Sequence, residues 1–334
     1  MLAQAVIFTA PNTVEFDTVR CPDPGPRDVV VRVTHSWISN GTEGSYLRGE
    51  RIQGDTPWRP GDPPVFPVVA GYQKVGQAEW VGADVTDIAV GETVFATVSK
   101  LAEPTWTFGA SGGHVSPAVT AREQVWKLPP EPDPLAFSGM VLTQVGYNCG
   151  ARAPLAVGDG AVVLGDGMVG QWAAQTLAWR GARVVLAGHH PDRLARFPEG
   201  LTRHRLDSRQ PDWVEQVAAL LPAGIQVLVD TVGSIESVEA LVPQMRYHGH
   251  IVSAGFYGTA DRLALQPLRA RELSVDMVSG WSPERMDATR DLIALGYLQT
   301  LPLITHHFPA IQAAQAWEMI AAKRDDVLGV VLDW

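Results

Sequence analysis

The feature that most constrains the fold is a glycine turn, Gly165-Asp-Gly167-Met-Val-Gly170, between the apolar run Ala161–Leu164 and the helically spaced stretch Met168–Arg180. Gly165 permits a tight turn, Gly167 lets the backbone approach a pyrophosphate, and Gly170 lets the helix pack on the strand. Met168 and Val169 then belong to the first helical turn, whose free N–H groups face the phosphates. A second buried strand follows, so the context predicts a dinucleotide-binding site rather than a purely structural turn.

The rest of the chain predicts an α/β fold in two parts. The first 150 residues are rich in strands and in turn-forming Gly and Pro, whereas strands and helices alternate from about Leu155 onward. Such alternation predicts a parallel sheet with helices on both faces. The clearest expected strands are Asp28–Thr34, Gly76–Val81, Gly91–Val98, Arg183–Ala187, Gln226–Val229 and His250–Ala254; the end of the chain adds a helix, Ala310–Ala322, and a strand, Leu328–Leu332.

Composition limits the classes of partner. The 334 residues carry a net charge of −10, which disfavours binding to nucleic acid and leaves a small molecule as the expected partner. No apolar run is long enough to span a bilayer, and the first residues do not resemble a signal peptide, so no membrane association and a cytoplasmic location are expected. Cys21 and Cys149 could form one disulfide but cannot build a four-cysteine zinc site.

The residues after the second strand bear on the choice of cofactor. NAD-selective enzymes usually end this strand with Asp or Glu, which holds the ribose 2′-hydroxyl. Here the position is Gly188, and His189, His190 and Arg193 follow as groups that could hold a 2′-phosphate. The pattern favours NADP(H), with NAD(H) as the alternative if both histidines are ordinary loop residues.

Motifs across the whole length resemble those of the medium-chain dehydrogenase/reductases. They are Val75-Gly76-Gln-Ala-Glu-Trp-Val81-Gly82, Val90-Gly91-Glu92-Thr-Val94, Asp230-Thr231-Val232-Gly233 and Gly249-His-Ile-Val-Ser-Ala-Gly255. The resemblance implies a GroES-like catalytic domain over 1–150, a Rossmann domain over 151–290 and a return to the catalytic domain over 291–334. It also implies cofactor contacts from Thr231, Val232, Gly255 and Phe256, and a homodimer formed through an edge strand near Glu272–Val278.

Two loops depart from the zinc-dependent members of that family. The cysteine loop reads Trp37-Ile-Ser39-Asn40-Gly-Thr42-Glu43, and the Gly-His-Glu motif reads Gly71-Tyr72-Gln73. Neither loop retains a cysteine or a histidine, so no catalytic zinc is expected.

Without zinc, the substrate oxygen needs a hydrogen-bonding acid or base. The leading candidate is Tyr72, because the resemblance puts it in the place of a metal ligand; Lys74, two residues on, would share its face in a strand and lower its pKa. Tyr72 could instead only fill the volume of the missing zinc. Ser39, Asn40, Thr42 and Glu43 are further candidates, although Glu43 could be structural and pair with Arg48. His114 is a possible acid or base that is more often a loop residue.

These features predict a zinc-independent oxidoreductase that interconverts a secondary alcohol and a ketone by hydride transfer. A narrower resemblance, carried by Ala254-Gly-Phe-Tyr257, Trp281-Ser-Pro-Glu284 and Val331-Leu-Asp-Trp334, is to the 3-hydroxyethyl bacteriochlorophyllide a dehydrogenases. Trp58, Trp106 and Trp281 could line a pocket for a bulky cyclic or sugar-like ligand, or simply be core. The alternatives are a quinone or enoyl reductase acting on an activated C=C, and a cofactor-binding protein without catalysis.

Overall fold

The computed structural model describes residues 1–53, 56–62, 65–102, 112–202, 204–257 and 260–334. The chain divides into two compact units: unit 1 comprises 1–141, 286–294 and 300–334, and unit 2 comprises 142–285 and 295–299. The first boundary between the units, after residue 141, lies nine residues before the expected one at 150. The second, after residue 285, lies five residues before the expected one at 290. Residues 295–299, expected in the C-terminal return, belong to unit 2.

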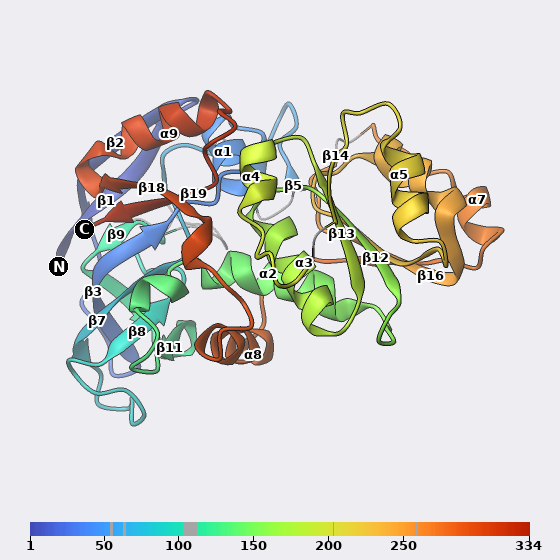
Figure 1. Cartoon of the computed structure of the whole chain (residues 1–334). Helices are drawn as coiled ribbons and strands as arrows, with labels where there is room; N and C mark the ends of the chain where they lie inside the picture. Colours follow the sequence, from blue (N-terminus) through green and yellow to red (C-terminus); the bar gives the residue numbers. More distant parts are fainter. Residues whose placement is uncertain (54–55, 63–64, 103–111, 203, 258–259) are drawn as a thin grey trace. The chain divides into compact units, whose positions relative to one another are not determined.

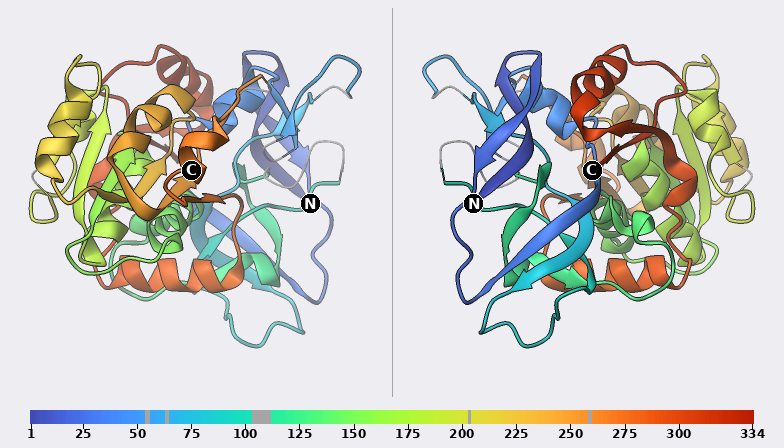
Figure 2. Two further views of the ribbon diagram at one scale, coloured as in Figure 1. Left: turned by 90° about the vertical axis from the view of Figure 1, so that its right-hand side faces the viewer. Right: turned by 90° about the vertical axis from the view of Figure 1, so that its left-hand side faces the viewer.

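Unit 1 is built on a mostly antiparallel sheet in the order β11-β8-β7-β3-β19-β18, with β10 also paired to β3. The long strand β3, Asp28–Trp37, pairs antiparallel with β7, Lys74–Val81, and the two can be followed side by side in Figure 2. The C-terminal strand β19, Gly329–Asp333, pairs with the other edge of β3, so the end of the chain completes the N-terminal sheet. The remaining strands are β8 (Thr93–Ala96), β10 (Ala118–Ala121), β11 (Val125–Lys127) and β18 (Ile304–Pro309).

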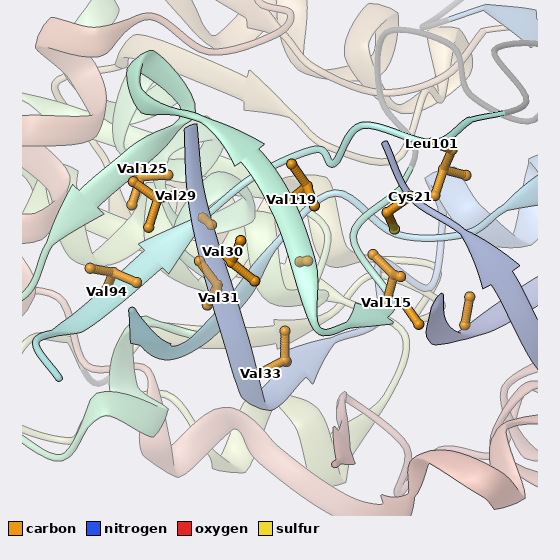
Figure 3. Close-up of a cluster of buried hydrophobic side chains, with 14 of the residues drawn as sticks. Cys21, Val29, Val30, Val31, Val33, Val94, Leu101, Val115, Val119 and Val125 are labelled. Atoms are coloured by element: carbon orange, nitrogen blue, oxygen red, sulfur yellow. The ribbon is translucent and has the colours of Figure 1, made fainter. Parts of the chain in front are cut away.

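Valines supply much of the core of this sheet. β-Branched side chains favour the pleated, half-buried surface of a strand. Figure 3 shows the cluster from Val29 and Val125 at one end to Cys21 and Leu101 at the other. Cys21 and Cys149 are both buried and neither is part of a disulfide, so the single disulfide left open by the sequence is not formed.

A second sheet of unit 1 forms around β1, Leu2–Ala10, which pairs with β2 (Thr13–Arg20), β6 (Val68–Val69) and β9 (Val115–Ser116). A buried cluster joins this sheet to α1 (Thr42–Leu47) and α9 (Ala313–Ala321) through Phe8 and Trp317. Helix α8, Pro283–Ala294, and the short hairpin of β4 (Arg51–Gln53) and β5 (Thr56–Pro57) are further elements of this part of the chain.

Unit 2 contains a parallel six-stranded sheet in the order β14-β13-β12-β15-β16-β17. Its first strand in sequence, β12, lies at the centre, which is the strand order of a doubly wound Rossmann sheet. The strands are β12 (Gly160–Leu164), β13 (Arg183–Gly188), β14 (His204–Asp207), β15 (Ile225–Asp230), β16 (Met245–Ser253) and β17 (Ser274–Met277).

Helices cover both faces of this sheet, as expected for its mostly apolar strands β12, β13 and β15. One buried cluster packs α2, α3 and α4 on one face, and another packs α5, α6 and α7 on the opposite face. Figure 1 shows α3 and α5 on opposite sides of β12 and β13. The helices are α2 (Met140–Arg152), α3 (Met168–Trp179), α4 (Pro191–Ala195), α5 (Trp213–Leu220), α6 (Ile235–Leu241) and α7 (Leu265–Arg269).

Among the residues described, no helix combines the length and apolar character that crossing a membrane requires.

Candidate functional site

The glycine turn of unit 2 has the open backbone that a diphosphate requires. Gly165 has φ +114°, a conformation that residues with a side chain rarely adopt. A Cβ on Gly170 would lie 1.9 Å from the carbonyl oxygen of Gly165, whereas a Cβ on Gly167 would meet nothing within 4 Å. Gly167 caps α3 without a side-chain hydrogen bond, and Met168 begins the helix. The first N–H groups of α3 therefore fit a bound pyrophosphate.

The strand ends beside this turn meet at one edge of the sheet. The hydroxyl of Thr231 donates to the carbonyl oxygen of Leu164 at 2.9 Å, and a Cβ on Gly165 would lie 2.3 Å from that hydroxyl oxygen. A Cβ on Gly255 would lie 2.1 Å from the backbone nitrogen of Gly233. The glycines thus allow β12, β15 and β16 to end in close contact, at the place where doubly wound sheets bind their ligands.

A buried carboxylate organises the end of β15. Asp230 is fully buried and accepts the N–H groups of Val232, Gly233 and Ser234 at 2.9, 3.0 and 3.1 Å. Tyr257 donates its hydroxyl to the same carboxylate at 2.6 Å; burial and this hydrogen bond raise the pKa of Tyr257. Asp230 therefore fixes a loop whose expected cofactor contacts, Val232 and Phe256, are exposed.

The end of β13 differs from the sequence-based expectation. The carboxylate of Asp166, from the glycine turn, accepts the backbone N–H of His190 at 2.7 Å, and its other oxygen lies 2.9 Å from Nδ1 of His190. Arg193 lies 3.8 Å from the same carboxylate, and His189 is exposed. A Cβ on Gly188 would lie 2.3 Å from Asp166 Oδ2. The strand itself ends without an acidic residue, but the carboxylate of Asp166 lies beside Gly188.

In unit 1, Tyr72 lies among hydroxyl groups. Burial and the negative charge of Glu43 raise the pKa of Tyr72, and hydrogen bonds with Ser39 and Thr42 offset only part of that rise. The structure thus brings together four of the candidates, Tyr72, Ser39, Thr42 and Glu43. The lowered tyrosine pKa expected from the sequence is wrong, because the phenol is buried beside an anion.

Lys74 does not serve as the cation for Tyr72. Strand β7 begins at Lys74 itself, and Gly71 has φ +81°, so Tyr72 precedes the regular strand and the expected alternation does not apply. The Lys74 ammonium hydrogen-bonds Ser99 Oγ at 2.8 Å and the carbonyl oxygens of Thr97 and Gly112. Burial lowers the pKa of Lys74 to about 7.

Glu43 pairs with a histidine rather than with an arginine. Its Oε2 lies 2.9 Å from Nε2 of His114, and its Oε1 accepts the N–H of Ser39 at 2.8 Å. Both side chains of the pair are buried, at 1% and 0% exposure. Arg48, the alternative partner, instead binds Glu50 on the surface. The other ring nitrogen of His114 lies 2.8 Å from Ser36 Oγ.

Asn40 lies apart from these groups. Its amide nitrogen donates to the carbonyl oxygen of Leu328 at 2.7 Å, while its amide oxygen is buried without a hydrogen-bond partner in the described structure. The hydrogen bond to Leu328 joins the loop that contains Asn40 to the segment before β19. The contact of Asn40 is therefore a structural one.

The cluster around Tyr72 contains the hydroxyls of Ser39 and Thr42 and one carboxylate, that of Glu43, which is already paired with His114. Among the described residues, no group of three or more His, Cys, Asp or Glu side chains could hold a metal ion. Zinc in proteins is bound by thiolate, imidazole and carboxylate groups. Ser39 and Tyr72 therefore do not fit such an ion.

Sequence reasoning did not single out two acidic residues that organise these sites. Asp166 occupies a variable position of the glycine motif, where the pattern carries no information about side-chain direction. Asp230 closes an apolar strand, and an acid directly before Thr-Val-Gly was the available signal. Of the three tryptophans considered for a pocket, Trp58 is 40% exposed and Trp106 lies outside the described residues.

Comparisons with known proteins agree with this architecture. Residues 169–294 match the family described as zinc-binding dehydrogenase. The chain is 29% identical to 2-desacetyl-2-hydroxyethyl bacteriochlorophyllide A dehydrogenase of Cereibacter sphaeroides, over 100% of this chain and 99% of that protein. The chain is therefore similar in sequence and in fold to the medium-chain dehydrogenase/reductases.

Solved structures of this fold include a dehydrogenase from Sinorhizobium meliloti 1021 bound to NADP, with a TM-score of 0.83 and 20% identity over all of both chains. An alcohol dehydrogenase from Escherichia coli CFT073 complexed with NADH has a TM-score of 0.84 at 20% identity, covering 100% of this chain and 99% of that one. The zinc-binding family match covers only unit 2 and helix α8, and therefore carries no information about Ser39 or Tyr72.

Proposed function

We propose that this medium-chain dehydrogenase/reductase is a zinc-independent, nicotinamide-dependent oxidoreductase that interconverts a ketone and a secondary alcohol, with Tyr72 as the proton donor to the substrate oxygen. The single observation that carries the proposal is the buried cluster of Tyr72, Ser39, Thr42 and Glu43, in which the sequence resemblance puts Tyr72 in the place of a metal ligand.

The raised pKa decides what Tyr72 can do. A phenol whose pKa is raised stays neutral over the working pH range, so it can donate a hydrogen bond to a carbonyl oxygen and gives up its proton only to a strongly basic alkoxide. Such a donor polarises a carbonyl and protonates the oxygen as reduction proceeds. Ser39 and Thr42 orient the phenol, and Glu43 keeps it protonated. When bound, the nicotinamide ring supplies or accepts the hydride.

Replacing Tyr72 by phenylalanine tests the role directly. Tyr72→Phe keeps the ring and removes only the hydroxyl, so kcat for ketone reduction should fall by about 10²-fold or more while nucleotide affinity is unchanged. Tyr297→Phe, at a tyrosine that is 46% exposed, is the matched control and should retain full activity. An unchanged kcat for Tyr72→Phe would remove Tyr72 from the mechanism.

Zinc independence has its own test. Dialysis against a chelator should leave both kcat and the unfolding temperature unchanged, because the hydroxyls of Ser39 and Tyr72 are poor ligands for zinc. A stoichiometric metal found by elemental analysis, whose removal abolishes turnover, would contradict the proposal.

The preferred cofactor form follows from the end of β13. The sequence favours NADP(H) because Gly188 is not acidic and because His189, His190 and Arg193 could bind a phosphate. Asp166 lies beside His190 and Arg193 and supplies a negative charge there. We therefore propose NAD(H) as the preferred form, the reverse of the sequence-based prediction; the ratio of KM values for NADH and NADPH measures it.

The substrate class rests on the relatives. The Cereibacter sphaeroides protein is named for a hydroxyethyl group on a chlorin ring, which supports a secondary alcohol on a bulky ring. A neutral Tyr72 would equally polarise the carbonyl of an enone or quinone. Product analysis separates the two reactions: a ketone gives a secondary alcohol, whereas an enone reduced at C=C keeps its carbonyl group.

We also propose a homodimer through β17, the edge strand of the unit 2 sheet. Val275 and Met277 on this strand are 40% and 69% exposed, and an unpaired apolar edge favours pairing with a second chain. Met277→Lys should shift the protein from dimer to monomer in sedimentation velocity. A wild-type monomer would contradict the proposal.

A further inference from the structure

The carboxylate of Asp166 occupies the space that a side chain at Gly188 would need. A Cβ on Gly188 would lie 2.3 Å from Asp166 Oδ2, 2.6 Å from Cγ and 2.5 Å from Cβ. Covalent geometry places the carboxylate oxygen of an aspartate about 2.4 Å from its own Cβ. One oxygen of Asp166 therefore lies at the distance that an oxygen of an aspartate at position 188 would have.

This geometry links the two positions. In a doubly wound sheet the acidic residue at the end of the second strand hydrogen-bonds the adenosine ribose 2′-hydroxyl. Here that strand is β13, it ends at Gly188, and no side chain fits at 188 while Asp166 keeps its position. The side chain of Asp166 therefore accounts for the glycine at position 188, where an acidic residue is usually found.

The surroundings hold the carboxylate in place. His190 donates its backbone N–H to Oδ2 at 2.7 Å and places Nδ1 2.9 Å from Oδ1, which joins the start of α4 to the glycine turn. Arg193 lies 3.8 Å from Oδ1, and the carboxylate side chain is only 5% exposed. A carboxylate fixed by such contacts is an oriented acceptor rather than a mobile surface charge.

We propose that Asp166 is the residue that selects the cofactor form: its carboxylate accepts a hydrogen bond from the adenosine ribose 2′-hydroxyl of NAD(H) and repels the 2′-phosphate of NADP(H). His190 and Arg193 are positioning residues that hold it. The proposal rests on the proposed use of a nicotinamide cofactor and assigns to the glycine turn a choice that the end of the second strand usually makes.

Nucleotide binding, followed by calorimetry without any substrate, tests the assignment. Wild-type protein should bind NADH at least tenfold more tightly than NADPH. Asp166→Asn keeps the shape but removes the charge and should move the ratio of the two dissociation constants at least tenfold toward NADPH. Asp192→Asn, which removes an exposed charge from helix α4, between His190 and Arg193, is the matched control and should leave the ratio unchanged.

An analogue keeps the test decisive if Asp166→Asn does not fold. NADH lacking the adenosine 2′-hydroxyl should bind wild-type protein about tenfold more weakly than NADH, and, where the variant folds, this difference should be smaller in Asp166→Asn, whose uncharged amide oxygen is a weaker acceptor. Tighter binding of NADPH to wild-type protein, or equal binding of NADH and its 2′-deoxy analogue, would overturn the assignment. If neither dinucleotide binds, the proposed function itself fails; if both bind and only the ratios disagree, only Asp166 loses its role.

Discussion

At the scale of single residues, the candidates chosen from the sequence lie close together, but their hydrogen-bond partners differ from those expected. The structure brings Tyr72, Ser39, Thr42 and Glu43 together, whereas Lys74 points to Thr97 and Ser99 instead of Tyr72. The reason is local: a left-handed Gly71 breaks the strand alternation on which the Lys74 prediction depended. The Glu43–His114 pair spans 71 positions, and no local pattern encodes such a contact.

Removing the Glu43 carboxylate should destabilise unit 1 strongly. In Glu43→Ala the buried His114 and the N–H of Ser39 lose their acceptor, which should cost about 3 kcal/mol in the free energy of unfolding. Denaturant titration measures this cost.

Glu50→Ala is the control for that change. It removes a carboxylate paired with Arg48 at a distance of 2.6 Å, but both side chains are nearly half exposed. Exposed pairs are worth about 0–1 kcal/mol, so this variant should unfold almost as the wild type does. Equal losses for the two variants would show that burial of the Glu43–His114 pair does not matter.

Lys74 should make stability depend on pH. Its pKa falls from 10.5 to about 7 on burial, so between these values the unfolded chain binds a proton that the folded chain does not. Stability should therefore rise as the pH increases from about 7 toward 10, by at most about 1.4 kcal/mol per pH unit. In Lys74→Met this rise should disappear, whereas Lys127→Met, at a 54% exposed lysine, should keep the wild-type slope. Identical slopes in both variants would mean that Lys74 is not the titrating group.

At the scale of elements, the pattern of apolar residues and the positions of the glycines predicted most of the helices and strands. The expected strands of unit 2 lie within a residue or two of β12, β13 and β15, because buried parallel strands appear in sequence as short apolar runs between turn residues. Helix α2 was not predicted. It is mostly buried, and its apolar residues are mixed with Thr, Gln and Asn, so no amphipathic stripe marks it.

Two glycines of the turn before α3 should respond differently to alanine. Gly170→Ala places a Cβ 1.9 Å from the Gly165 carbonyl oxygen and should destabilise unit 2 by several kcal/mol. Gly167→Ala meets nothing within 4 Å, so its unfolding temperature should match the wild type, while nucleotide affinity should fall at least tenfold because the methyl group lies where a pyrophosphate approaches. Unchanged affinity in Gly167→Ala would argue against nucleotide binding at this turn.

At the scale of the whole molecule, the chain passes between the two units four times, and this could be predicted only in outline. Residues 295–299 belong to unit 2 because Gln299 accepts a hydrogen bond from the Trp172 indole at 3.1 Å and donates its N–H to Gln175 at 2.8 Å. These contacts join helix α3 to a segment more than 120 positions away. No pattern within residues 295–299 predicts such contacts.

Ligand-linked stability should distinguish the units. A nucleotide that binds at the glycine turn stabilises the folded form of unit 2 by about 2.7 kcal/mol at a hundredfold excess over its dissociation constant. In scanning calorimetry, NADH should therefore raise the transition that Gly170→Ala lowers and leave in place the one that Glu43→Ala lowers. Gly167→Ala should show the wild-type transitions without the shift. If NADH raised the temperatures of both transitions equally, the two units would unfold cooperatively. The four chain connections between the units, and not the nucleotide site alone, would then determine stability.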